Sequence, residues 1–103
     1  MKRLPLALAL ALPAIGAHAQ APDALQVRGW AGGCANCHGT NGQSQPGTAA
    51  LAGMNRDDIV RKMMDFKNGR QSATVMHQLS KGYTDEQIAA IAAYFAAQKS
   101  KGD

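Results

Sequence analysis

A chain of 103 residues has room for one small domain. Its net charge of +4 is spread without a run of basic residues, which argues against nucleic-acid binding, since that needs a concentrated basic face. One tryptophan, two tyrosines, two phenylalanines and two cysteines three positions apart provide neither a large aromatic core nor a disulfide framework, so a large apolar cofactor is the expected substitute.

Residues 1–19 have the pattern of a secretory signal peptide. Lys2-Arg3 precedes an apolar run over residues 4–16, and Ala17-His18-Ala19 is a small-x-small cleavage pattern. The run is too short for a membrane span, although an uncleaved anchor is the alternative. We therefore expect export, cleavage of the leader with its two positive charges, a single domain over residues 20–103, and no membrane span in that domain.

The first predicted helix covers residues 23–31, with Leu25, Val27 and Trp30 as apolar anchors. Gly32 and Gly33 are expected to end it just before the cysteines. Residues 39–53 are rich in Gly, Ser, Thr and Pro, which predicts a long loop.

Two further helices are predicted from their capping residues. Asn55 is a good N-cap with two aspartates after it, and this helix runs to about Asn68, with Gly69 as its stop. Thr84 and Gln87 form a capping box that opens a helix to about Lys99. Residues 70–83 have no strong period and include at most a helical turn. Because nothing alternates like a strand, the predicted fold class is all-α with long loops.

The pentapeptide Cys34-Ala35-Asn36-Cys37-His38 carries the chemistry. A structural zinc ion needs four ligands, and after cleavage His77 is the one further histidine or cysteine. A thioredoxin-like dithiol needs a βαβ setting that the predicted elements do not provide. A c-type haem attachment fits best, because two cysteines at this spacing reach the two vinyl groups of a porphyrin while the histidine lies beneath the iron.

Beyond the pentapeptide, the segments CANCHGTNG, LAGM, FKNGR, TVM and KGYTDEQIAAIAAYFA are distinctive. Over about residues 29–98 the chain resembles the class I cytochromes c of the small bacterial type. More closely, it resembles the haem-binding domain of the cytochrome subunit of flavocytochrome c sulfide dehydrogenase. The resemblance implies a periplasmic cytochrome c domain with three or more helices around one covalent haem c and with the first and last helices crossing. Trp30 would meet Tyr94 or Phe95 there, and Ala89, Ala93 and Ala96 would permit close approach.

The same resemblance implies the ligands of the iron. Cys34 and Cys37 would form the thioethers, His38 would be the proximal ligand, and Thr74-Val75-Met76 matches the TxM position that supplies the distal ligand. His77 is the rival, and an open sixth position is a further alternative.

Neighbouring residues have expected roles as well. Met63 and Met64 are expected in the core and Met54 near the pocket. A backbone carbonyl should bind Nδ1 of His38, and the family's proline before Leu-Ala-Gly is replaced here by Ala49-Ala50.

The predicted function is one-electron transfer, with no catalysis by the chain itself. The resemblance suggests an FAD-containing sulfide dehydrogenase subunit, or a dehydrogenase of another sulfur compound, as redox partner. The alternatives are a freely diffusing shuttle to a terminal oxidase or reductase, and a gas-binding or peroxidatic haem protein. Four basic residues, Lys62, Lys67, Arg70 and Lys81, form a docking patch for an acidic partner or simply a solvated face.

Overall fold

The computed structural model describes residues 2–5, 7–13 and 22–100. Within them lie four α-helices: α1 (Ala24–His38), α2 (Arg56–Lys67), α3 (Met76–Leu79) and α4 (Asp85–Ala96). Two 3-10 turns, η1 (Thr40–Gly42) and η2 (Ser80–Gly82), follow α1 and α3. The described residues hold no strand beyond an isolated bridge between Gln45 and Thr48, so the all-α prediction is confirmed.

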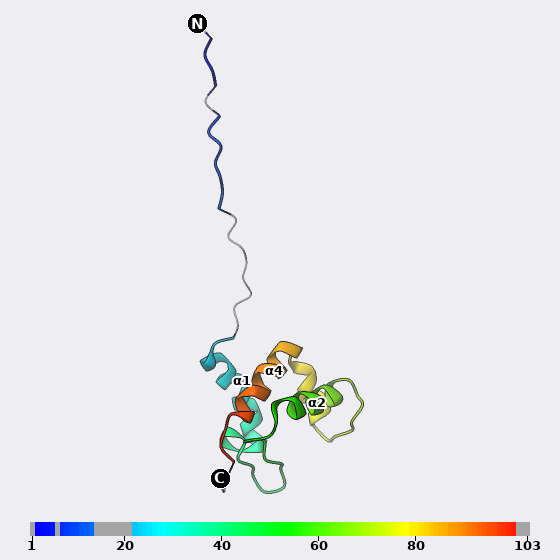
Figure 1. Cartoon of the computed structure of the whole chain (residues 1–103). Helices are drawn as coiled ribbons and strands as arrows, with labels where there is room; N and C mark the ends of the chain where they lie inside the picture. Colours follow the sequence, from blue (N-terminus) through cyan, green and yellow to red (C-terminus); the bar gives the residue numbers. More distant parts are fainter. Residues whose placement is uncertain (1, 6, 14–21, 101–103) are drawn as a thin grey trace.

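Residues 2–5 and 7–13 lie apart from the helical body (Figure 1). They have no regular secondary structure, and Leu4, Leu8, Leu10 and Leu12 are exposed. The predicted cleavage pattern Ala17-His18-Ala19 lies outside the described residues. None of the helices that the structure describes is long and apolar enough to cross a bilayer.

Helix α1 differs from the prediction at its end. The helix begins after Asp23, whose carboxylate accepts a hydrogen bond from the Gln26 N–H at 2.7 Å, but it continues through both glycines to His38. An interior glycine costs a helix about 1 kcal/mol relative to alanine, which packing can offset. Here Ala31 is buried in the core, and a β-carbon at Gly33 would lie 3.3 Å from the Tyr83 hydroxyl. Gly33 therefore permits the close approach of Tyr83, a β-carbon at Gly32 would meet nothing within 4 Å, and neither glycine ends the helix.

The capping predictions for α2 and α4 are confirmed. The side chain of Asn55 accepts hydrogen bonds from two backbone N–H groups at the start of α2, and Gly69, with a φ of 76°, follows its end. Thr84 and Gln87 form the reciprocal capping box of α4, which ends at Ala96, three residues before the predicted Lys99. The predicted helical turn in residues 70–83 is α3 together with η2.

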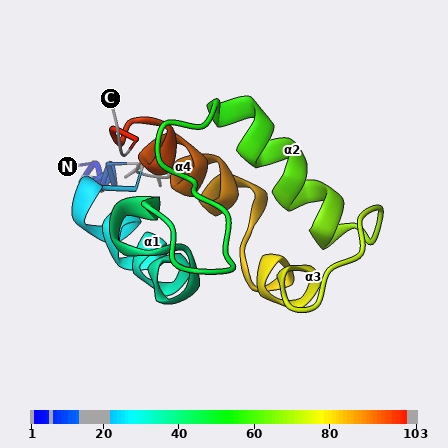
Figure 2. The same cartoon turned by 90° about the horizontal axis from the view of Figure 1, so that it is seen from below.

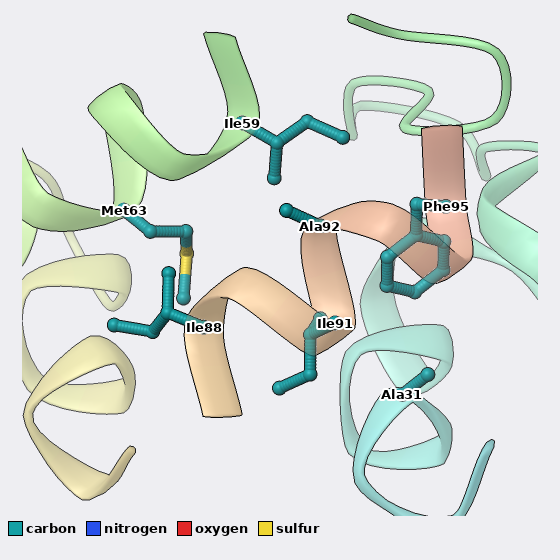
Figure 3. Packing of buried hydrophobic residues seen from close by; sticks show 7 residues of the cluster. All are labelled: Ala31, Ile59, Met63, Ile88, Ile91, Ala92 and Phe95. Atoms are coloured by element: carbon teal, nitrogen blue, oxygen red, sulfur yellow. The ribbon is translucent and has the colours of Figure 1, made fainter. Parts of the chain in front are cut away.

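The core lies where α4 packs between α1 and α2 (Figure 3). Its members are the buried Ala31, Ile59, Met63, Ile88, Ile91, Ala92 and Phe95. Ala92 is fully buried whereas Ala93 is exposed, so the expectation that Ala93 permits close approach was wrong. Ala92 shares the helix face of Ile88, four residues earlier, while the next residue is turned about 100° away. Trp30 is half-buried against this cluster, to which Phe95 belongs.

Candidate cofactor site

A cavity of about 550 Å³ is enclosed by the end of α1, the loop after it, α2 and the segment that includes α3. In Figure 2, α1 and α3 lie on two sides of the fold, and the loop over residues 43–55 runs between them. The volume is within the roughly 300–1,000 Å³ of sites for small molecules and cofactors. Its apolar walls are built mainly from Leu51, Ile59, Met63, Phe66 and Ile91.

Cys34, Cys37 and His38 line the cavity from α1. Because α1 continues through the pentapeptide, the two cysteines lie three residues apart on one face of a helix. They are not joined to each other; Cys34 is half-buried and Cys37 exposed. Burial raises the pKa of the Cys34 thiol above its ordinary value, and a backbone hydrogen bond partly offsets this rise. The two cysteines thus line the cavity as a pair from one helix face.

The ring of His38 is held by the loop. Its Nδ1 lies 2.6 Å from the carbonyl oxygen of Ala49. Since a carbonyl can only accept, Nδ1 carries the proton and Nε2 keeps the lone pair that a metal ion needs. Ala49 stands where the family's proline was expected, so the chain keeps a carbonyl partner for His38 without that proline.

Met76 lines the same cavity from the first position of α3, together with Val75 and Leu79. His77, its rival, is not among the lining residues; its Nδ1 is buried and has no hydrogen-bond partner in the described part of the chain. Met54 lines the cavity as expected. Met63 is a core residue that also lines the cavity. Met64 packs against the core but does not line the cavity.

These residues suit a covalently attached haem. The site offers two thiols on adjacent turns, an imidazole with a fixed tautomer, a thioether on another element and apolar walls, which is the donor set of a c-type haem with histidine and methionine ligands. In the residues that the structure describes, no three His, Cys, Asp or Glu side chains are gathered around a position for a bare metal ion.

Tyr83 is a lining residue that the sequence analysis did not identify. It lies between η2 and α4, outside the periodic segments, so no sequence pattern indicated its place. Burial raises the pKa of its hydroxyl, and the nearby Cys34 adds to the rise. Tyr83 therefore closes the cavity beside the first cysteine.

Two of the four basic residues of the suggested patch have partners within the chain. Lys67 Nζ lies 2.9 Å from Asp85 Oδ1 and donates to the Tyr83 carbonyl at 2.8 Å, and Arg70 Nε lies 3.2 Å from Asp65 Oδ1. Lys62 and Lys81 are exposed, and Lys62 lies at the cavity. The charge available for docking is thus smaller than the sequence suggested.

Comparison with known proteins agrees with this site. The cytochrome c family model matches residues 28–99. The chain is 45% identical over 62 residues to the cytochrome subunit of sulfide dehydrogenase of Chlorobaculum tepidum, covering 60% of this chain and 56% of that protein. It is 36% identical over 100 residues to cytochrome c4 of Pseudomonas aeruginosa, covering 96% of this chain and 50% of that protein.

A shorter relative is matched over most of both chains. Cytochrome c-553 of Helicobacter pylori is 33% identical over 85 residues, which is 81% of this chain and 88% of that protein. The chain therefore spans about half the length of the first two relatives and most of the third. With a family match over more than half of its residues, the chain belongs to the cytochrome c family, electron carriers that hold a covalently attached haem c.

Proposed function

We propose that this cytochrome c is an exported one-electron carrier that attaches its haem through Cys34 and Cys37 and holds the iron between His38 and Met76. The observation that carries the proposal is the lining of one cavity: it includes all four residues, whereas the rival His77 is not part of it. The basic and apolar pattern of residues 1–19 supports the export of the chain and a periplasmic domain over residues 20–103.

When bound, the haem supplies the one-electron chemistry of its iron, and the chain adjusts it. The Ala49 carbonyl fixes the orientation of the His38 ring and raises the basicity of its other nitrogen. The thioether of Met76 and the apolar walls favour the reduced state and so raise the potential. His38 and Met76 would hold the group in both of its oxidation states, so little of the protein would have to rearrange.

The exposed side of the site is the expected route for electrons. Cys37 and Gly33 are exposed while Cys34 is half-buried, so a partner can approach the edge of the haem that the cysteines hold. The likeness to a cytochrome subunit of sulfide dehydrogenase supports a flavoprotein that oxidises sulfide, or another sulfur compound, as the electron donor. A freely diffusing shuttle is the alternative, and a large apolar docking face would count against it.

Carbon monoxide tests the ligand assignment. The reduced protein, produced with its haem, should bind carbon monoxide poorly at neutral pH because Met76 occupies the sixth position. Met76→Ala should bind it readily, and His77→Ala should behave as the unaltered protein. Ready binding by the unaltered protein, or an unchanged spectrum and potential in Met76→Ala, would contradict the assignment.

A separate experiment tests the partner. Capture of the tagged holoprotein from periplasm, with flavin and haem absorbance followed together, should recover a flavoprotein in a fixed ratio to haem. Recovery of haem without flavin would instead favour the diffusing shuttle.

A further inference from the structure

The segment that presents Met76 has little stability of its own. Helix α3 has four residues, too few for the helical hydrogen bonds to offset the cost of nucleation. In the described structure its N-cap, Val75, makes no side-chain capping hydrogen bond. Val75 and Leu79 are both about half exposed, so packing covers this turn incompletely. Something else must hold the backbone of Met76.

Ser80 provides that contact. It is the buried polar residue among the described residues, with 0% of its surface exposed. Its Oγ donates to the carbonyl oxygen of Met76 at 2.7 Å, and its backbone N–H donates to the same carbonyl. The carbonyl of the first residue of α3 is thus held by two donors from one residue at the end of the turn.

We propose that Ser80 is a positioning residue for the distal ligand: its hydroxyl fixes the backbone of Met76 and thereby keeps the thioether at the cavity. The inference rests on the proposed role of Met76. A thioether is a weak ligand, so its hold on the iron depends on how narrowly the chain restricts it. Without the hydroxyl, the turn opens more often and a competing ligand reaches the sixth position more easily.

Imidazole binding to the ferric holoprotein measures this opening. Ser80→Ala should bind imidazole about five-fold more tightly than the unaltered protein, the factor expected for one lost hydrogen bond. The absorption band of a thioether bound to ferric iron should weaken in parallel. Ser80→Cys, which has a somewhat larger side chain and a weaker donor, should show an affinity between those of Ser80→Ala and the unaltered protein, and serves if Ser80→Ala yields too little holoprotein.

Thr84→Ala is the matched control. It removes the hydroxyl that accepts from the Gln87 N–H at 3.1 Å in the capping box of α4, a loss of similar size outside α3. Its imidazole affinity should stay within about two-fold of the unaltered protein even though its unfolding midpoint falls. Equal affinities in Ser80→Ala and Thr84→Ala would overturn the positioning role.

Met76→Ala distinguishes a failure of the proposed Ser80 role from a failure of the proposed Met76 ligand. If Met76→Ala binds imidazole tightly while Ser80→Ala matches Thr84→Ala, the proposed ligand stands and the role of Ser80 is wrong. If Met76→Ala binds imidazole as weakly as the unaltered protein, the ligand assignment fails and the inference fails with it.

Discussion

At the scale of single residues, Gly42 is a position where any side chain would both strain the backbone and meet the core. Its φ is 75°, which L-residues rarely adopt, and its carbonyl accepts hydrogen bonds from the N–H groups of Leu51 and Ala52. A β-carbon there would lie 2.8 Å from Cδ1 of Phe95 and 2.9 Å from the backbone nitrogen of Ala52. Gly42 therefore lets the loop after α1 lie directly on α4.

We expect Gly42→Ala to lower the free energy of unfolding of the holoprotein by about 3 kcal/mol, from a strained backbone together with a clash in the core. Gly69→Ala is the control, because φ there is 76° but a β-carbon would meet nothing within 4 Å. It should cost about 1 kcal/mol, the backbone contribution alone. Denaturant unfolding measures both variants, and equal losses would show that the crowding at Gly42 is relieved without cost.

The His38 partner shows what single residues reveal in a sequence and what they do not. The pentapeptide predicted Cys34, Cys37 and His38 as haem-binding residues without any knowledge of the fold, and the structure places all three at one cavity. The carbonyl of Ala49 could not be identified, since a backbone oxygen has no sequence signature and its place depends on how residues 39–53 fold back. Ser80 was missed for a similar reason, because a serine in an aperiodic segment is ordinarily exposed.

At the scale of elements, Lys67 joins the end of α2 to the start of α4. Its ammonium group donates to the Tyr83 carbonyl and to Asp85, and its side chain is 24% exposed. Residues 68–82, with Met76 among them, form a loop whose two ends this lysine fastens together. Because only 24% of the Lys67 side chain is exposed, this contact is partly shielded from solvent, unlike an ordinary surface pair.

We expect Lys67→Met to reduce the free energy of unfolding by about 1–2 kcal/mol, since two hydrogen bonds of a charged group are lost while the aliphatic stem is retained. Arg61→Met is the control: its ion pair with Asp58 has both side chains about half exposed or more, so its loss should be below about 0.5 kcal/mol. Thermal unfolding of the two holoproteins compares them. Similar midpoints would mean that Lys67 contributes no more than a surface pair.

Helix ends were predicted well where they depend on neighbouring residues and poorly where they depend on distant ones. Asn55, Gly69 and the Thr84–Gln87 box act within a few residues, so α2 and the start of α4 were placed correctly. The end of α1 was misplaced because the packing of the helix against α4, and of Tyr83 beside Gly33, involves residues distant in the sequence. The prediction that Ala93, and not Ala92, packs closely was wrong for the same reason. Which face of a helix is buried depends on its tertiary neighbours.

At the scale of the whole molecule, part of the positive charge is already paired within the chain. Arg56, Arg61, Lys67 and Arg70 each form an ion pair with an aspartate of the chain. Lys62 is exposed at the cavity and belongs to none of these pairs. The electrostatic potential at the cavity should thus depend on single nearby lysines such as Lys62 more than on the net charge of +4.

Electron exchange with an anionic reagent such as ferrocyanide tests this distribution. Lys62→Gln should lower the rate constant about two-fold at low ionic strength, and the difference should vanish as salt screens it. Arg56→Gln changes the net charge equally, but its guanidinium already pairs with Asp57. It should therefore alter the rate less. Equal effects of both variants would show that net charge governs the approach.

The packing of α1 against α4 bears on when the protein can fold. Ala31 and Phe95 belong to one core although they stand near opposite ends of the domain. A growing polypeptide therefore lacks half of that core until its last helix has been synthesised, and long-range contacts of this kind form late. Until then α1 and α2 lack the helix that packs between them, so the cavity that all three line cannot be complete.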